Sequence, residues 1–435
     1  MILLDGIGDR SYPELGHRTP LQVARTPVLD QLARDGANGL YHAAYLGQAL
    51  PSENAHFAIF GYDMDSFPGR GALEALGAGI PLRSGEVALL AHFVSVSRAA
   101  DGVTLVMKEG APRVSDQEIG DLLRAVEDFS VNGIKVRLNH AGGIRCILTL
   151  AGKIAPFVTD SDPIIEDRPL AAVRAWKDFA ADPAALNTAH ALNMYLEWVY
   201  HKLETYPGNA KRREAGIAPV NCLVTQRAGR LKSVPPFSEK YGMKGLSIAS
   251  GIVYHGLAGY LGMEVRKVAD TARPGSDLAQ RLKTAMKLLP RYDFIHVHTK
   301  GPDQAAHAKN PSSKIKVIEA LDKGIGTALK ELMSEPELLI VIASDHSTPS
   351  GGPLIHSGEA VPLVFHGPGV RRDDVRHYDE ISAAGGALGC VRGKELMYLI
   401  LNHLDRAKLQ GLMDTPVDQP YWPGRYEPFR LNDTN

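Results

Sequence analysis

A serine stands where an amphipathic helix is expected to begin, in the segment Pro51–Asp63. The amino end of a helix presents free N–H groups and the positive end of the helix dipole, so it can hold a phosphate and favours an alkoxide. Ser52 is therefore a candidate nucleophile for phosphoryl transfer. Serine is also a favoured capping residue, and for a single serine before a helix the capping role is the usual one.

Acid and imidazole side chains follow apolar runs that are typical of buried parallel strands, and they are Asp5, Asp303, His307, Asp345, His346 and His356. The loops at the carboxyl ends of parallel strands form the ligand crevice of a sheet. Asp303 and His307 are four residues apart, so they share one face if their segment is helical. Together with Ser52 they are enough to bind two divalent ions, an arrangement that recurs in phosphoryl displacement.

Seven ordered segments carry a family resemblance, and they are Asp5–Arg10, Pro51–Asp63, Gly69–Gly71, Thr159–Pro163, Lys300–His307, Asp345–Pro349 and His356–Gly358. In this order they resemble the cofactor-independent phosphoglycerate mutases of the archaeal type, which belong to the alkaline phosphatase superfamily. The resemblance runs from Asp5 to about His403, nearly the whole chain. It implies a metal-dependent phosphotransferase or mutase that acts through a serine.

The resemblance also implies how the ligands divide between two metal ions. Asp303, His307 and His356 would bind one ion. The other ion would be bound by Asp5, Ser52, Asp345 and His346. Ser52 would become a phosphoserine and return the group to a different oxygen. Three histidines among the ligands disfavour magnesium and point to manganese, with zinc or cobalt as alternatives.

Several residues near these motifs are candidate substrate ligands, each with a plainer alternative. Asn54 could donate a hydrogen bond to the phosphoryl group, and His56 could contact a phosphate or pack against the sheet. Lys300 could neutralise a phosphate or extend along the surface. Arg70 lies between two glycines, which would let a backbone approach closely, and this context favours a substrate contact over a surface charge.

The elements that must position these residues follow an α/β pattern, because short apolar runs alternate with helical periodicity from residue 2 onward. Residues 90–175 differ, since paired strands at 91–97 and 103–107, a helix at 116–129 and a hairpin over 134–150 are expected there. A long helix is expected at 187–206. We therefore predict a doubly wound, mostly parallel sheet core of the alkaline phosphatase type with a smaller inserted α+β domain.

The predicted domains are a metal-binding phosphotransfer core of residues 1–89 and 176–435 and an inserted substrate-binding cap of residues 90–175. A cleft between them would enclose a small phosphorylated substrate and keep water from the phosphoserine. In the cap, Asp160 and Asp162 could order hydroxyl groups of the acceptor, although their pattern is also that of a simple turn.

Composition limits the partners of this 435-residue chain. It has 48 Lys and Arg against 49 Asp and Glu, so a nucleic acid or an acidic membrane has no electrostatic support as a partner. The three cysteines, Cys146, Cys222 and Cys390, are far apart, which is typical of a reducing cytosol. With no long apolar span and no signal peptide, the protein is expected to be cytoplasmic. The oligomeric state is not indicated.

The chain departs from the family where the family carries arginines that hold the substrate carboxylate and phosphate. The departures lie at Leu89–Phe93, Lys108–Arg113, His140–Ala141 and Gln226–Gly229. A displacement of one residue along a strand sends a side chain to the opposite face, so Arg227 is not expected to reach the usual place. We expect weak interconversion of the two phosphoglycerates unless another arginine takes over the substrate contacts of the missing ones. The candidates are Arg113, Arg145, Arg227 and Arg230.

The predicted function is two-metal phosphoryl-type transfer through Ser52 on a small phosphorylated or phosphonylated carboxylate, such as 2- and 3-phosphoglycerate. One alternative is a paralogue that moves a phosphonyl or phosphoryl group to or from a phosphoglycerate-like acceptor in specialised phosphonate metabolism. Another is a simple phosphatase. A non-enzymatic binding protein is the alternative from a different class, although such descendants usually lose ligands and every expected ligand type is present here.

Overall fold

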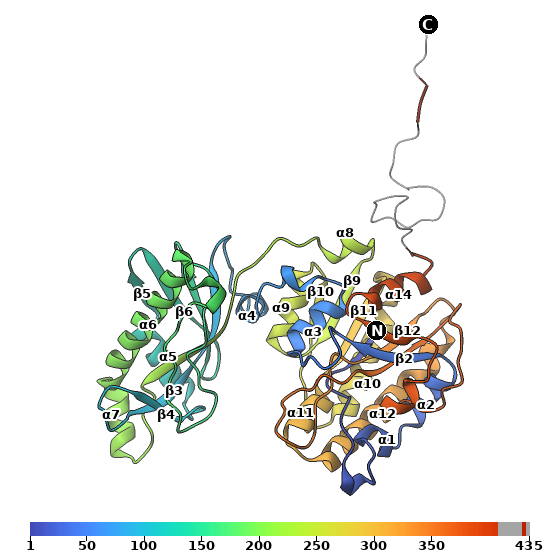
Figure 1. The fold of residues 1–435 in the computed structure, drawn as a ribbon, viewed down its shortest axis with the longest axis horizontal. Helices are drawn as coiled ribbons and strands as arrows, with labels where there is room; N and C mark the ends of the chain where they lie inside the picture. Colours follow the sequence, from blue (N-terminus) through green and yellow to red (C-terminus); the bar gives the residue numbers. More distant parts are fainter. Residues whose placement is uncertain (408–428, 432–435) are drawn as a thin grey trace. The chain divides into compact units, whose positions relative to one another are not determined.

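The computed structural model describes residues 1–407 and 429–431. The chain forms two compact units (Figure 1). The core unit comprises Met1–Phe67, Val234–Gly251 and the described residues from Ala258 onward, and the insert unit comprises Pro68–Ser233 and Ile252–Leu257. No helix within the described residues is both long enough and apolar enough to cross a membrane.

The core unit is built on an eight-stranded sheet with the strand order β10-β9-β11-β1-β12-β13-β2-β14. Its strands are β1 (Ile2–Leu4), β2 (Ala37–His42), β9 (Gly245–Ala249), β10 (Glu264–Lys267), β11 (Phe294–Thr299), β12 (Ile340–Ala343), β13 (Val361–His366) and β14 (Gly389–Arg392). β13 pairs antiparallel with both of its neighbours, and all other pairs in this sheet are parallel. The predicted doubly wound, mostly parallel core is confirmed.

Helices of the core unit connect these strands. They are α1 (Pro20–Val23), α2 (Pro27–Arg34), α3 (Ser52–Ile59), α8 (Phe237–Tyr241), α10 (Pro274–Leu288), α11 (Gly301–His307), α12 (Pro311–Ser334), α13 (Glu380–Ala383) and α14 (Glu395–His403). The apolar core lies between the sheet and the helices α2, α10 and α12, where Leu32, Leu282 and Ile325 pack against Leu4 and Ile342. α12 begins where Asn310 caps it, because the Asn310 side chain accepts the N–H of Ser313.

The insert unit has a separate antiparallel sheet of order β4-β3-β7-β6-β5, in which β8 also pairs with β3. Its elements are α4 (Arg70–Gly77), β3 (Val87–Arg98), β4 (Leu105–Glu109), α5 (Asp116–Val126), β5 (Asp128–Val131), β6 (Ile134–Gly142), β7 (Arg145–Ala151), α6 (Pro183–Glu204), α7 (Pro207–Glu214), β8 (Cys222–Gly229) and the first part of α9 (Ile252–Tyr260). Alternate residues of β3, such as Leu89 and Phe93, pack against α5 and α6, as the two-residue period of a strand requires.

Two helices differ in length from the sequence prediction. The helix expected over 116–129 ends at Val126, because residues from Asp128 pair as β5 with β6. The helix expected over 187–206 already begins at Pro183, because the Asp182 side chain caps it by accepting the N–H groups of Ala184 and Ala185.

The insert unit contains the whole of the predicted cap domain. It is wider than residues 90–175, because α6 and β8 also pack on its sheet. The predicted domain boundaries themselves stay a proposal.

Helices α4 and α9 approach each other closely within the insert unit, and glycine makes the contact possible. A Cβ atom on Gly256 of α9 would overlap the carbonyl oxygen of Leu73 in α4. Gly259, three residues further along α9, has nothing within 4 Å of an added Cβ atom.

We expect Gly256→Ala to lower the free energy of unfolding by about 1 to 3 kcal/mol, because α4 and α9 must separate to admit the methyl group. Gly259→Ala is the matched control, and it should stabilise the protein by about 0.4 to 1 kcal/mol because alanine restricts the unfolded chain. Chemical denaturation of the two variants measures both effects. Equal stability of the variants would contradict the close contact.

Candidate metal centre

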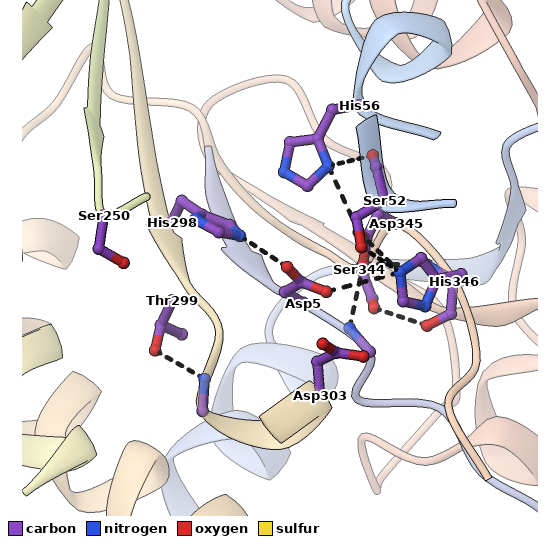
Figure 2. A network of polar contacts seen from close by, with 12 residues as sticks. Asp5, Ser52, His56, Ser250, His298, Thr299, Asp303, Ser344, Asp345 and His346 are labelled. Atoms are coloured by element: carbon purple, nitrogen blue, oxygen red, sulfur yellow. Dashed lines mark hydrogen bonds and ion pairs between the residues drawn. The ribbon is translucent and has the colours of Figure 1, made fainter. Parts of the chain in front are cut away.

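The connections that follow β1, β2, β11 and β12 bring the candidate catalytic residues together at one edge of the core sheet. Figure 2 shows Asp5, Ser52, Asp303, Asp345 and His346 among them. The ligand-type side chains in these loops and in the helices that they lead into are Asp5, Ser52, Asp303, His307, Asp345, His346 and His356. All strands concerned run parallel to one another, so their carboxyl ends meet at this edge. The predicted meeting of these loops is therefore seen in the structure.

Ser52 is the first residue of α3, and its side chain does not cap the helix, because Pro51 occupies the capping position. The Ser52 Oγ atom lies 2.8 Å from Nε2 of His346. The hydroxyl is thus directed at the carboxylate and imidazole groups rather than at its own helix. The expectation that α3 is amphipathic was wrong, since almost every residue of the helix is buried between the sheet and its neighbours.

One group of ligand-type atoms centres on Asp303. α11 places Asp303 and His307 on one face, and Oδ1 of Asp303 lies 3.2 Å from Nε2 of His307. The same oxygen lies 3.5 Å from Nε2 of His356. Asp303, His346 and His356 have ligand atoms close enough to hold a metal ion together. Because His307 is 39% exposed, this group is open on one side.

A second group is fully buried and consists of Asp5, Asp345 and His346. Nε2 of His346 lies 3.1 Å from Oδ2 of Asp345 and 3.6 Å from Oδ1 of Asp5. Oδ1 of Asp345 accepts the backbone N–H groups of Gly6 and His346, each at 3.0 Å, which fixes the carboxylate. His346 thus belongs to both groups and lies between them.

Burial and mutual repulsion shift the pKa values of the ionisable groups in the second group, so that its two carboxyl groups do not ionise equally easily. Burial, together with repulsion from Asp345 and Asp303, raises the pKa of Asp5 to about 7. Burial lowers the pKa of His346, but attraction by Asp345 outweighs it and raises the value to about 9. Burial likewise opposes ionisation of Asp345, yet His346 holds its pKa well below the usual range. A buried set of carboxylates and imidazoles fits divalent cations, which would compensate the negative charge.

Two buried histidines support this centre from behind. His298 lies with Nε2 at 3.0 Å from Oδ2 of Asp5. Nδ1 of His56 lies 2.8 Å from the carbonyl oxygen of Ser52 and 3.3 Å from Oδ2 of Asp345. His56 is fully buried, which supports the packing role that the sequence left open beside a phosphate contact. The sequence analysis missed His298, although two histidines on alternate positions of an apolar strand are a signal of buried polar contacts.

The other predicted substrate residues of the core unit lie close to this centre. Lys300 precedes α11 and is near enough to Asp5 to lower the pKa of that carboxyl group, against the larger effect of burial. Asn54 is half-buried in the first turn of α3.

The remaining predicted substrate residues belong to the insert unit. The Arg70 guanidinium pairs with Glu74 at 2.7 Å. A Cβ atom on Gly71 would overlap the carbonyl oxygen of Ala88 in β3, so the glycine beside Arg70 is required by packing of α4. The close backbone approach that the sequence suggested is therefore made by the protein itself.

Asp160 and Asp162 lie next to β8 in the insert unit. Oδ1 of Asp160 accepts the backbone N–H of Arg227 at 2.7 Å, and Asp162 accepts the side-chain amide of Gln226. Nε2 of His92 lies 3.7 Å from Oδ2 of Asp162. Arg227 has a φ of 55°, at an irregularity in the pairing of β8 with β3. This left-handed conformation is rare for arginine, so the bulge redirects the Arg227 side chain.

Comparisons with known proteins agree with the geometry of this centre. Residues 1–403 match the Metalloenzyme superfamily. The 2,3-bisphosphoglycerate-independent phosphoglycerate mutase 2 of Methanocaldococcus jannaschii is 42% identical over 419 residues, which cover 95% of this chain and 94% of that protein. The chain belongs to the cofactor-independent phosphoglycerate mutase family. The mutase of Methanopyrus kandleri is 35% identical, covering 94% of this chain and 97% of that protein.

Two solved structures share the mutase fold. A Pyrococcus horikoshii protein matches with a TM-score of 0.76 and 28% identity, covering 94% of this chain and 98% of that one. The cofactor-independent phosphoglycerate mutase of Thermoplasma acidophilum matches with a TM-score of 0.62 and 29% identity, covering 93% of this chain and 98% of that one. Membership of the mutase family confirms the predicted resemblance and the prediction of a metal-dependent enzyme.

Binding of divalent ions to the group of Asp5, Asp345 and His346 should tighten as the pH rises. Below a pH of about 7, an ion must displace a proton from both Asp5 and His346, and between about 7 and 9 only from His346. The logarithm of Kd should therefore fall by about two per pH unit in the first range and by about one in the second. Titration calorimetry across this range measures the slopes, and a Kd independent of pH would contradict the raised pKa values.

Proposed function

We propose that this member of the mutase family interconverts 2-phosphoglycerate and 3-phosphoglycerate through a phosphoserine at Ser52. The main support for this proposal is the position of the Ser52 hydroxyl. It does not cap α3, and it lies 2.8 Å from Nε2 of His346, beside the two groups of candidate metal ligands. The amino end of α3 adds free N–H groups that favour a phosphate there. A cytoplasmic location is part of this proposal, and three free cysteines support it.

Two divalent ions would be held by the side chains of these two groups together with Ser52 and His307, divided between the ions as the family resemblance implies. Asp303, His307 and His356 would bind one ion. The other would be bound by Asp5, Ser52, Asp345 and His346. Bound ions lower the pKa of the serine hydroxyl and neutralise developing charge on the phosphoryl oxygens. The mixture of carboxylate and imidazole ligands favours manganese, with zinc or cobalt as alternatives.

The phosphoryl group would be transferred twice, first to Ser52 and then back to glycerate, and neither transfer consumes water. Ser52 Oγ forms a bond to phosphorus while the bond from phosphorus to the C2 oxygen of 2-phosphoglycerate breaks, and the serine proton ends on that oxygen. Glycerate stays bound, and its C3 oxygen then forms a bond to phosphorus while the bond from phosphorus to Ser52 Oγ breaks. The C3 hydroxyl proton returns to Ser52, and 3-phosphoglycerate leaves.

The family resemblance assigns the arginines that hold the substrate carboxylate and phosphate to segments of the insert unit. Leu90 lies in the stretch where the family carries an arginine, and it packs with Ala88 and Ile147 in a small apolar cluster. Its register partner in the neighbouring strand β8 is Gln226, which lies in another of the stretches that depart from the family. Two adjacent positions therefore lack the expected guanidinium. This observation favours a second candidate function, transfer of a phosphonyl or phosphoryl group to or from a related acceptor.

Among the arginines that could replace the missing guanidinium groups, Arg145 is the best placed to bind the substrate carboxylate. Arg145 in β7 is the register partner of His92 in β3, and directly paired residues present their side chains on the same face. Among the described residues, the Arg145 guanidinium has no hydrogen-bond or ion-pair partner. Arg230 instead donates to the carbonyl oxygen of Ile154, and burial lowers its pKa, which is typical of a structural role.

Phosphorus NMR of the manganese-loaded protein with 3-phosphoglycerate tests the proposed function. We expect a signal of 2-phosphoglycerate that is absent after chelation, because Ser52 is a poor nucleophile without a cation. Inorganic phosphate alone would instead indicate a phosphatase. An unchanged 3-phosphoglycerate signal would favour the second candidate.

Ser52→Ala separates the chemical role of the serine from its place in the fold. Turnover should fall by orders of magnitude, whereas the unfolding temperature should hardly change, because Ser52 makes no capping hydrogen bond. Mass spectrometry of the quenched protein should detect a phosphorylated Ser52 peptide only in the unsubstituted chain. A phosphopeptide that maps elsewhere would contradict the assignment.

Arg145→Met tests which arginine replaces the missing guanidinium groups. Loss of one charge-assisted hydrogen bond costs about 1.5 to 3 kcal/mol, so kcat/KM for 3-phosphoglycerate should fall about 10- to 150-fold. Arg113→Met is the control, since Arg113 is also exposed but lies outside the strands of the insert sheet. Equal kinetics of the two variants would show that Arg145 is not the substrate ligand.

A further inference from the structure

Thr348 connects the two groups of ligand-type residues. It is fully buried, in the connection between β12 and β13. Its hydroxyl donates to Oδ1 of Asp303 at 2.9 Å and lies 3.1 Å from Nδ1 of His346. One side chain thus touches a member of each group, on the opposite side of the imidazole ring from Ser52.

The number of protons fixes the direction of these two hydrogen bonds. A hydroxyl has one proton, and here it is donated to the Asp303 carboxylate. The short contact with His346 then requires that Nδ1 carries a proton and donates it to the threonine oxygen. When a bound cation displaces the second ring proton, the proton on Nδ1 stays with the threonine oxygen, and the lone pair is left on Nε2, the atom that faces Ser52 and Asp345. This tautomer is the one that can bind a cation from that side.

The surrounding backbone holds the threonine hydroxyl in place. The Thr348 N–H donates to the carbonyl oxygen of Gly8 at 2.9 Å. The buried Lys314 ammonium donates to the carbonyl oxygens of Thr348 and Gly8, both at 2.8 Å, and pairs with Asp9 at 3.1 Å. A Cβ atom on Gly6 would lie 2.5 Å from the Thr348 hydroxyl, so only glycine leaves room for it there.

We infer that Thr348 is a positioning residue that fixes the His346 tautomer with Nε2 available to metal and orients the Asp303 carboxylate. The inference rests on the proposed function, in which His346 and Asp303 bind different ions. A partner of this kind typically changes metal affinity about 10- to 100-fold when it is removed. Because one hydroxyl serves both groups, its loss should weaken binding of both ions.

Thr348→Val and Thr348→Ser form a matched pair, since valine keeps the shape and serine keeps the hydroxyl. Competition with a chelator for zinc should show both Kd values raised about 10- to 100-fold in the valine variant and changed less than about threefold in the serine variant. Thr188→Val is the control, because its buried hydroxyl bonds Ala155 and Ala184 in the insert unit. Unfolding of the metal-free proteins checks that each variant is folded.

Unchanged zinc affinity in Thr348→Val, or equal weakening in both Thr348 variants, would overturn the inference. Failure of the unsubstituted protein to bind either zinc or manganese would overturn the proposed function together with the inference. Nitrogen-15 NMR of the zinc-loaded, histidine-labelled protein gives a test that does not depend on a folded variant. The His346 signals, assigned by their loss in His346→Gln, should show a protonated Nδ1 and a metal-bound Nε2. Zinc on Nδ1 would overturn the inference.

Discussion

The mutual repulsion of three buried carboxylates, those of Asp5, Asp303 and Asp345, is the constraint on which the metal centre depends. Removal from water strengthens this repulsion. Each carboxylate is oriented by a donor that lies behind it. His298 contacts Asp5, two backbone N–H groups contact Asp345, and Thr348 contacts Asp303. The other oxygens of Asp5 and Asp345 face His346, and Oδ1 of Asp303 faces His307 and His356 as well as Thr348. A cation bound among them would offset the negative charge of the carboxylates.

The reversal of β13 keeps three ligand-type residues at the same edge of the sheet. A parallel successor to β12 would require the chain to cross back to the opposite edge before the next strand. β13 runs antiparallel to β12, so the connection between them stays at the carboxyl edge of the parallel strands. Asp345, His346 and His356 all lie in this connection. The single antiparallel strand is therefore part of how the centre is assembled.

Local patterns made much of the site predictable from sequence. The spacing of Asp303 and His307 and the placement of acids after apolar strands are short-range signals, and both led to the observed positions. His298 could not be assigned in this way, because its partner Asp5 is 293 residues away in the chain. Thr348 could not be assigned either, because its contact with Asp303 joins two segments that are 45 residues apart. The left-handed Arg227 gave no signal either, since its conformation follows from strand pairing that a single sequence does not reveal.

The central strand β1 carries a consequence for the order of folding. Ile2 is in register with Val297 of β11 and Ile342 of β12, so β1 has no sheet partner until these much later segments have been synthesised. The insert unit has its own hydrophobic core, and in the sequence it lies between β1 and β11. It can therefore fold before β1 has a sheet partner. During synthesis β1 therefore stays without its sheet partners, and Asp5 stays without His346, until the residues up to 346 have been made.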